Sequence, residues 1–437
     1  MSNIKKLLEG VEVEWKPLAY SEYGVAELSR GRVMSKEYLI NNAGEYPVYS
    51  SQTANNGEIG KIRTFDYDGE YVTWTTDGAN AGTVFHRTEK FSITNVCGLI
   101  RIKNTKVLNY KFLFYWLSIE AKKYVYSGMG NPKLMSNQIA KIPIPIPPLE
   151  TQQEIVRILD SFSMLTAELQ AELQARKSQY EYYRNQLLAY PMEESDQSSL
   201  RSNRSATSIQ NSDNPTRQLS ISNPHTGNSV LQPWGKVEWN TLGEIFNIKN
   251  GYTPSKSNQK YWENGTIPWF RMEDIRENGR VLNKSIQYVN SCAIKGGKLF
   301  PANSIIVATS ATIGEHALIT VPFLSNQRFT NLSLKKEYTN KFIIKFLFYY
   351  GFVLDEWCKN NITVGNFAGV DMIGFKKFLI PIPSLEEQER IVSILDKFDT
   401  LTTSLTEGLP KEIELRQKQY EYYRDMLFSF PKNNIKA

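Results

Sequence analysis

An internal repeat constrains the fold of this chain more than any other feature of its sequence. Residues 145–160, PIPPLETQQEIVRILD, return as residues 381–396, PIPSLEEQERIVSILD, and 11 of the 16 positions are identical. Farther along, the hexapeptide QYEYYR occurs at 179–184 and again at 419–424. Such self-similarity in the same order predicts two copies of one architecture.

Shorter sequence matches extend the repeat toward the start of each half. Residues 13–15, VEW, answer 237–239, and residues 111–115, KFLFY, answer 345–349. Between these landmarks the two halves differ strongly. Because 437 residues are enough for two domains with a core each, the repeat indicates shared helices and divergent domains.

The segment between the copies has a different composition. Residues 192–232 are dense in Ser and Asn and almost lack aromatic residues. Such a segment cannot bury enough apolar surface to offset the entropy lost on ordering. We therefore expect a mobile linker there.

Each copy of the repeat begins a long helix. From Ile155 to Tyr190 apolar and aromatic residues recur at steps of four and three, the heptad seam of a helix that packs against another. Residues 149–190 would form a rod of about 60 Å, and the proline-rich segment before it fixes its start. The second copy has an extra four-residue step beside Gly408-Leu409-Pro410, where we expect a kink or a break.

The expected fold class is α+β, with two mixed α/β domains separated by two long antiparallel, coiled-coil-like helices in a pseudo-two-fold repeat. We expect the first domain at 1–147, its helix at 148–191, the linker at 192–232, the second domain at 233–382, its helix at 383–431 and a tail at 432–437. The seam favours core packing for most tyrosines of the repeated hexapeptide over base stacking. Tyr182 and Tyr422 fall off the seam and are candidates for contact with a protein partner.

Composition narrows the possible functions only slightly. The net charge of +6 is compatible with nucleic-acid binding but is a weak signal alone. The three cysteines, Cys97, Cys292 and Cys358, are scattered, which argues against a disulfide framework and a zinc site. No apolar run approaches the roughly 18 residues that span a bilayer. We expect a cytoplasmic protein with no metal and no membrane contact.

The divergent domains carry loops of small polar residues. Asn, Gln and Arg can make paired hydrogen bonds to base edges, while Ser, Thr and backbone amides hold phosphates. These loops could also be ordinary turns. If they read DNA, the candidate contacts are Gln52, Asn55, Asn56, Asp77 and Asn80 in the first domain, and Tyr252, Thr253, Ser255, Lys256, Ser310, Thr312, Gln327 and Arg328 in the second.

The common motifs of catalysis are absent from the sequence. There is no GxxxxGK[ST] loop, no GxGxxG after a strand, no Asn-Pro-Pro-aromatic run, no GxSxG, no HExxH and no paired CxxC. We expect no catalytic residue, although scattered Asp, Glu and Lys residues leave a nuclease centre open.

The doubled segment PIPxLE…Q…IVxILD resembles the specificity subunits of type I restriction–modification systems. The resemblance covers both halves, and in the divergent domains it includes residues 250–256, NGYTPSK, 267–271, IPWFR, and 130–134, GNPKL. The resemblance also includes residues 365–366, GN, and on these matches it adds Lys133, Trp269, Arg271 and Asn366 to the candidate DNA contacts. The second domain matches better than the first.

This resemblance implies a non-catalytic reader of a two-part double-stranded DNA target. Each domain would read one half-site, and the helices would act as a ruler for the unread spacer. Two methyltransferase subunits would dock on the chain, and restriction/translocase subunits would complete the enzyme. The chain itself would carry no cofactor, because S-adenosylmethionine, ATP and magnesium would belong to the partners.

Two other functions stay open at this point. One is a recognition subunit of a related system whose partner fuses methylation and cleavage. The other is a coiled-coil interaction protein without a DNA role. A gel shift with and without a co-purified methyltransferase would separate the three.

Overall fold

A computed structural model describes residues 7–128, 130–189, 237–363, 368–404 and 406–431. The expected linker and tail lie outside these ranges, as do the first six residues. The chain divides into two compact units, which are described separately. Unit 1 comprises residues 1–170 and 413–437, and unit 2 comprises residues 171–412.

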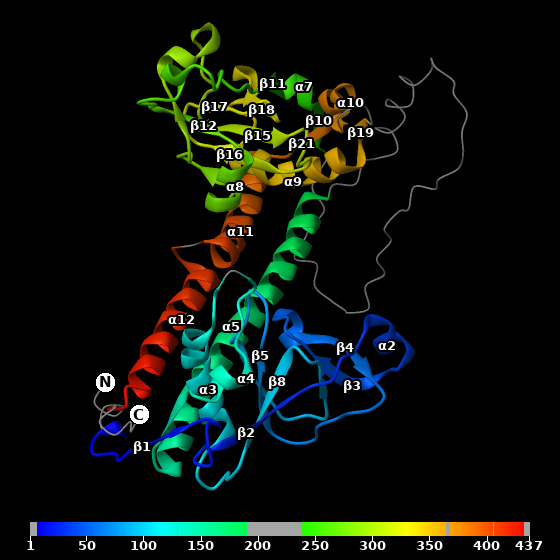
Figure 1. Cartoon of the computed structure of the whole chain (residues 1–437). Helices are drawn as coiled ribbons and strands as arrows, with labels where there is room; N and C mark the ends of the chain where they lie inside the picture. Colours follow the sequence, from blue (N-terminus) through cyan, green and yellow to red (C-terminus); the bar gives the residue numbers. More distant parts are fainter. Residues whose placement is uncertain (1–6, 129, 190–236, 364–367, 405, 432–437) are drawn as a thin grey trace. The chain divides into compact units, whose positions relative to one another are not determined.

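Unit 1 is built on two small sheets (Figure 1). The four-stranded sheet has the order β2–β8–β5–β6, made of Ala26–Arg30, Cys97–Ile102, Tyr71–Thr75 and Val84–Arg87. The three-stranded sheet has the order β4–β3–β7, made of Glu58–Ile62, Ala43–Tyr49 and Ser92–Ile93. Helices α2 (Lys36–Asn41), α3 (Tyr110–Glu120) and α4 (Ser136–Ile139) complete the domain, and α3 packs on β5 and β6.

Unit 2 has a larger central sheet (Figure 1). Its order is β11–β18–β15–β16–β13, made of Phe246–Asn250, Phe329–Leu334, Ser304–Ala308, His316–Ile319 and Val281–Leu282. A three-stranded sheet, β14–β12–β17, is made of Tyr288–Val289, Ile267–Phe270 and Leu324–Ser325, and β19 (Ile362–Thr363) pairs antiparallel with β20 (Gly369–Val370). The helices of the domain are α7 (Leu242–Ile245), α8 (Met272–Asn278), α9 (Ile344–Asn360) and α10 (Met372–Lys377).

The central sheet of unit 2 is buried on both faces. Leu332 and Val307 pack in the core shared with α9, whereas Phe329 and Ile306 pack in a second core with Phe270. Side chains alternate between faces along a strand, so every residue of β15 is buried. Because both faces of the sheet are buried, the sequence SIIVA at 304–308 is apolar at nearly every position instead of alternating with polar residues.

The repeated landmarks form the same element in each unit. In unit 1, β1 (Glu14–Pro17) pairs with β9 (Pro143–Ile146), and Trp15 lies opposite Pro145. In unit 2, β10 (Glu238–Thr241) pairs with β21 (Leu379–Ile382), and Trp239 lies opposite Pro381. The repeated VEW and PIP segments thus form the two strands of a small antiparallel pair, and this pair occurs once in each unit.

The first long helix is continuous, and the second is broken. Helix α5 covers Leu149–Leu188, 40 residues or about 60 Å. The second copy gives α11 (Leu385–Thr403) and α12 (Gly408–Leu427), so the break expected beside Gly408 is confirmed. Gly408 has a φ of +78°, and a Cβ atom there would lie 2.5 Å from the Thr400 carbonyl oxygen, so the turn requires glycine.

The seam residues face the neighbouring helix, and they are buried at the ends of the seam and partly buried in its middle. Within unit 1 the ring of Phe162 in α5 stacks on that of Tyr423 in α12, with centroids 5.4 Å apart. Within unit 2 the ring of Tyr183 in α5 stacks on Phe398 in α11 at 5.7 Å. The off-seam Tyr182 and Tyr422 are 50% and 57% exposed. The same pair of ring types therefore joins the helices in both units.

Candidate nucleic-acid interface

Three loops of unit 2 meet at one edge of its central sheet. Strand β18 lies between β11 and β15 and is antiparallel to both, with Asn250 opposite Thr330 and Ala308 opposite Phe329. The ends of β11 and β15 therefore lie beside the beginning of β18. Residues 250–256, 309–312 and 325–328 follow or precede these strand ends, and we call them the unit 2 edge.

Hydrogen bonds join the first and third of these loops. The Tyr252 amide donates to the Ser325 carbonyl over 2.8 Å, and the Thr253 hydroxyl donates to the Gln327 side-chain oxygen. The Asn326 amide donates to the carbonyl of Phe270 over 3.0 Å, which places Arg271 next to the same loop. Candidate residues separated by over 70 positions in the sequence thus lie side by side.

The middle loop extends the edge toward the β19–β20 strand pair. The Thr309 amide donates to the Arg328 carbonyl over 3.1 Å, and the Thr309 carbonyl accepts from the Val370 amide over 3.0 Å. Ser310 forms a bridge with Gly369, so it lies against β20. Asn366 lies outside the described residues.

The side chains of this edge are basic and polar. Ser255, Lys256, Gln327 and Arg328 are exposed, whereas Thr253, Ser310 and Thr312 are partly exposed. The ring of Tyr252 is half-buried, because its hydroxyl donates to the Ala293 carbonyl over 3.1 Å and accepts from the Lys295 amide over 2.9 Å. Tyr252 thus supports its loop more than it offers a free hydroxyl.

The structure corrects the expectation for Trp269. This side chain is only 2% exposed, and its indole N–H donates to the Tyr252 carbonyl over 3.0 Å. The side chain packs in a core with Val289 and Leu324, so it offers no exposed surface for a direct base or phosphate contact. Its effect on the edge is to hold the 250–256 loop.

Arg271 stands at the boundary of this core. Its guanidinium carbon lies 5.6 Å from the centroid of the Trp269 ring, and its Nε is 3.8 Å from the Glu273 carboxylate. The backbone amide of Arg271 donates to buried Asp274 over 2.7 Å, while burial raises the pKa of that carboxyl group. The Nε is itself buried and finds no hydrogen-bond acceptor among the described residues, whereas the side chain as a whole is 30% exposed, so a ligand could reach only the exposed part of this side chain.

Unit 1 also brings its candidate residues together. Asn55 and Asn56 lie in a short 3₁₀ turn at Ala54–Gly57, both exposed and both at positive φ, 49° and 54°. Asn80 donates to the Thr53 hydroxyl over 3.2 Å, which joins this turn to the 75–80 loop. Exposed Gln52 donates to the Glu58 carbonyl at the end of the same turn.

The third segment of the unit 1 edge carries Lys133. Its ammonium lies 3.8 Å from the Asp77 carboxylate, and the Gly78 amide donates to the Pro132 carbonyl over 3.0 Å. Residues 52–57, 75–80 and 130–134 form this edge. Asp77 can either accept from a base amino group or hold Lys133 in place.

A buried arginine that the sequence did not single out shapes this edge. Arg87 is 5% exposed and donates to the Asn56 carbonyl, and its guanidinium carbon lies 3.5 Å from the centroid of the Tyr49 ring. Burial lowers the pKa of Arg87. No local pattern marks Arg87 as buried, because the buried residues of VFHR in β6, Val84 and Arg87, lie on opposite faces of the strand.

Identical side chains fasten each domain to its long helix. In unit 1, Asp160 of α5 accepts from the Lys111 ammonium and from the Tyr115 hydroxyl, both over 2.7 Å. In unit 2, Asp396 of α11 accepts from Lys345 and Tyr349, both over 2.6 Å. Burial, and then the carboxylate, raise the pKa of both tyrosines.

A second identical contact lies one turn into each helix. Gln152 accepts from the Asn109 amide over 2.9 Å and donates to the carbonyls of Val107 and Pro147 over 2.8 Å. Gln388 accepts from the Ile343 amide over 2.8 Å and donates to the carbonyls of Lys341 and Pro383. We call the Lys–Asp–Tyr set together with this glutamine the helix clamp. The helix clamp explains why the Lys, Asp, Tyr and Gln positions recur in both halves of the sequence while the loop sequences differ.

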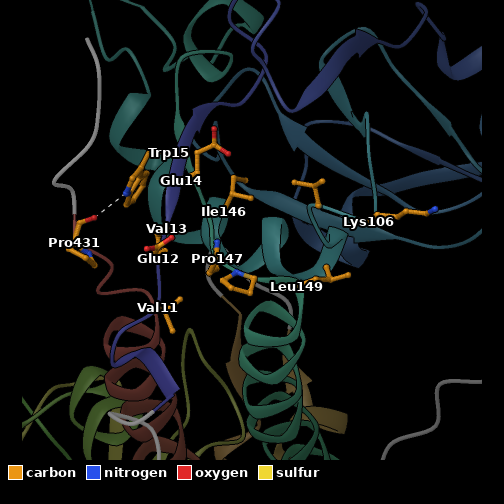
Figure 2. A pocket seen from close by; sticks show the side chains of 12 residues that line it. Val11, Glu12, Val13, Glu14, Trp15, Lys106, Ile146, Pro147, Leu149 and Pro431 are labelled. Atoms are coloured by element: carbon orange, nitrogen blue, oxygen red, sulfur yellow. Dashed lines mark hydrogen bonds between the residues drawn. The ribbon is translucent and has the colours of Figure 1, made fainter.

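Two features of the described residues bear on catalysis, namely possible metal ligands and a hollow in unit 1. The described residues contain no group of three or more His, Cys, Asp or Glu side chains placed to hold a metal ion. Unit 1 has a hollow beside β1 and β9 (Figure 2). It is lined by apolar residues and prolines together with Glu12, Glu14 and Lys106. The indole N–H of Trp15, which also lines it, donates to the Pro431 carbonyl over 3.1 Å. This lining offers no nucleophile with an adjacent base. Over the same residues, no helix is long and apolar enough to cross a membrane.

Comparison with known proteins gives one family for both halves. A family model described as type I restriction modification DNA specificity domain matches residues 13–176 and 236–415. The chain is 36% identical over 453 residues to the type I restriction enzyme EcoR124I/EcoR124II specificity subunit of Escherichia coli, covering 99% of this chain and 98% of the relative. It is 60% identical over 209 residues to the EcoprrI specificity subunit of Escherichia coli, a match that spans 46% of this chain and 52% of that relative.

Solved structures show the same fold. The S subunit of a type I restriction–modification system from M. genitalium matches with a TM-score of 0.52 and 15% identity, covering 97% of this chain and 98% of the other. A chain from a structure of complex assembly and conformational transition in a type I R-M system matches with a TM-score of 0.55 and 17% identity, covering 95% and 97%. The expected fold class, two mixed domains with long helices between them, is confirmed.

Proposed function

Because the chain belongs to the family of type I restriction–modification DNA specificity subunits, we propose that it reads a two-part DNA target, one half-site with each loop edge. The observation that carries this proposal is the contrast within the repeat. The helix clamps are identical in the two units, whereas the loop edges share no residue pattern. A chain with two copies of the same scaffold, each carrying a different polar loop edge, is suited to read two different DNA sequences.

The chemistry of the edges fits DNA. Exposed Asn55, Asn56 and Gln327 offer amides for base edges, and exposed Lys133, Lys256 and Arg328 offer cations for phosphates. We keep the candidate contacts of both edges in this proposal, with Trp269 reassigned to support. The domains at 1–147 and 233–382 are then the two target-recognition domains.

Partner subunits supply the chemistry in this proposal. Two methyltransferase subunits dock on the two repeated helix faces, where Tyr182 and Tyr422 are exposed at equivalent positions. Restriction and translocase subunits then join the complex, and S-adenosylmethionine, ATP and magnesium act on these partners. The modest charge of +6 is sufficient, since the methyltransferases share the contact with phosphates.

Exchange of one domain tests the proposal. Residues 239–378 are replaced by the equivalent segment of another family member, which leaves the Asp396 clamp residue and all of unit 1 in place. Expressed with the methyltransferase, the hybrid should methylate sites with a new second half-site and the original first one. The reciprocal exchange of the first domain is the matched control. If both half-sites change together in either hybrid, the two edges do not read independently.

A further inference from the structure

Two consecutive polar residues of β18 are completely buried at the base of the unit 2 edge. Thr330 and Asn331 both have 0% exposure. Successive side chains of a strand point to opposite faces of the sheet, and a strand covered on both faces is usually apolar. Thr330 therefore lies on the face that Leu332 shares with α9, and Asn331 lies on the face of Phe329 and Phe270.

Asn331 joins the bases of two loops. Its Oδ1 accepts from the buried Ser325 hydroxyl over 2.9 Å, at the start of the 325–328 loop. Its Nδ2 donates to the Lys249 carbonyl over 3.0 Å, immediately before the 250–256 loop. Both ends of the amide are thus used.

Thr330 joins the 250–256 loop to the third loop. Its hydroxyl donates to the Asn250 side-chain oxygen over 3.0 Å. Since that uses its one proton, the Thr309 hydroxyl donates to the Thr330 oxygen over 2.9 Å. Thr309 begins the 309–312 loop, and its backbone already bonds Arg328 and Val370.

The close packing of the loops leaves little freedom around these bonds. A Cβ atom at Gly251 would lie 2.3 Å from the Ser325 Oγ and 2.4 Å from the Asn326 carbonyl. The backbone of the 250–256 loop therefore touches the 325–328 loop directly. Any slippage at the loop bases would be transmitted to Thr253 and Gln327, which bond one another above this contact.

We propose that Thr330 and Asn331 are positioning residues that set how strictly the second half-site is read. Neither residue reaches DNA; each fixes the relative placement of loops that do. Valine or leucine would fill the same core positions, so the polar atoms are explained by placement rather than by packing. This inference rests on the proposed function.

The test is Thr330→Val in the full chain, assembled with its methyltransferase. Valine has the same shape and loses both bonds. A mismatched base pair normally costs a factor of about 5 to 150 in binding. For single mismatches in the second half-site this discrimination should fall about fivefold or more, whereas mismatches in the first half-site should be rejected as before. Thr330→Ser keeps the hydroxyl and should restore discrimination.

Ser333→Ala is the matched control on the same strand. The Ser333 and Ser304 hydroxyls form a buried pair 2.9 Å apart between β18 and β15, at the end away from the loops. This variant loses the same kind of bond on the same two strands and should discriminate normally. Equal loss in Ser333→Ala, or full discrimination in Thr330→Val, would overturn the inference.

Two further outcomes are informative. If the unmodified complex rejects no mismatch in either half-site, the proposed function fails, and the result is distinct from failure of the positioning role. If Thr330→Val does not fold, Ser325→Ala removes only the donor to Asn331, and normal discrimination by that variant overturns the inference.

Discussion

Lengthening α5 between its two stacked contacts tests whether this helix measures the distance between half-sites. Phe162 stacks on Tyr423 within unit 1, and Tyr183 stacks on Phe398 within unit 2. The helix between them already contains a four-residue unit twice, TAEL at 166–169 and QAEL at 170–173. Inserting Gln-Ala-Glu-Leu after Leu173 adds about 6 Å and turns the helix about 40° beyond a full turn.

The expected result is a longer unread spacer with both half-sites unchanged. One base-pair step is about 3.4 Å, so the spacer should grow by one or two base pairs, with part of the change taken up as rotation. Four-residue insertions act as stutters in heptad seams, so folding should survive. The α11–α12 break after Thr403 lies within unit 2, and α12 continues from there into unit 1.

The assay is a map of methylated sites in a genome that carries the variant and its methyltransferase. An insertion of eight residues adds about 12 Å and should lengthen the spacer by three or four base pairs. A variant that reorders residues 170–173 without adding length should keep the original spacer. An unchanged spacer with both insertions would refute the ruler, since the distance would then be set elsewhere.

Two further predictions concern single side chains. Lys256→Ala should weaken DNA binding uniformly across sequences and make the slope of log K against log salt concentration shallower by about 1. Arg271→Ala should cost about 1–3 kcal/mol of binding free energy at the second half-site. Unchanged DNA binding in salt titrations of both variants would remove the two residues from the interface. Burial raises the pKa of Tyr180 from 10.0 to about 12, so its contribution to stability is complete below pH 10 and is lost between pH 10 and 12. Tyr180→Phe should flatten the fall of the unfolding free energy in that window, and an identical alkaline slope in denaturant titrations would contradict this.

The scaffold could be predicted from the sequence because its signals are local and periodic. A heptad seam specifies a long helix wherever it occurs, and Pro410 after Gly408 specifies a break for reasons confined to a few residues. The internal repeat then predicted that the chain contains two copies of one architecture. Even the echo at 111–115 had a physical cause, since Lys111 and Tyr115 both bond the repeated Asp160.

The edges could be predicted only as a set of loops. That loops 250–256, 309–312 and 325–328 meet depends on the register of β18 with two neighbours, which no local pattern encodes. Trp269 was assigned as a contact from its motif alone, whereas the structure buries it against β14 and β17, a packing that no local pattern encodes. Arg87, Thr330 and Asn331 were missed because each bonds groups far away, such as Asn56 for Arg87 and Lys249 for Asn331.

The helix clamp also bears on how such a protein can change over generations. The two units are an internal comparison: Asp160 and Asp396 keep the same partners, while almost every loop residue around them differs. Clamp and edge share no hydrogen-bonded residue in the contacts described above, so a substitution in a loop leaves the fastening to the long helix untouched. With the proposed function, a lineage can therefore change its target sequence by mutation of one edge at a time, without a compensating change in the scaffold.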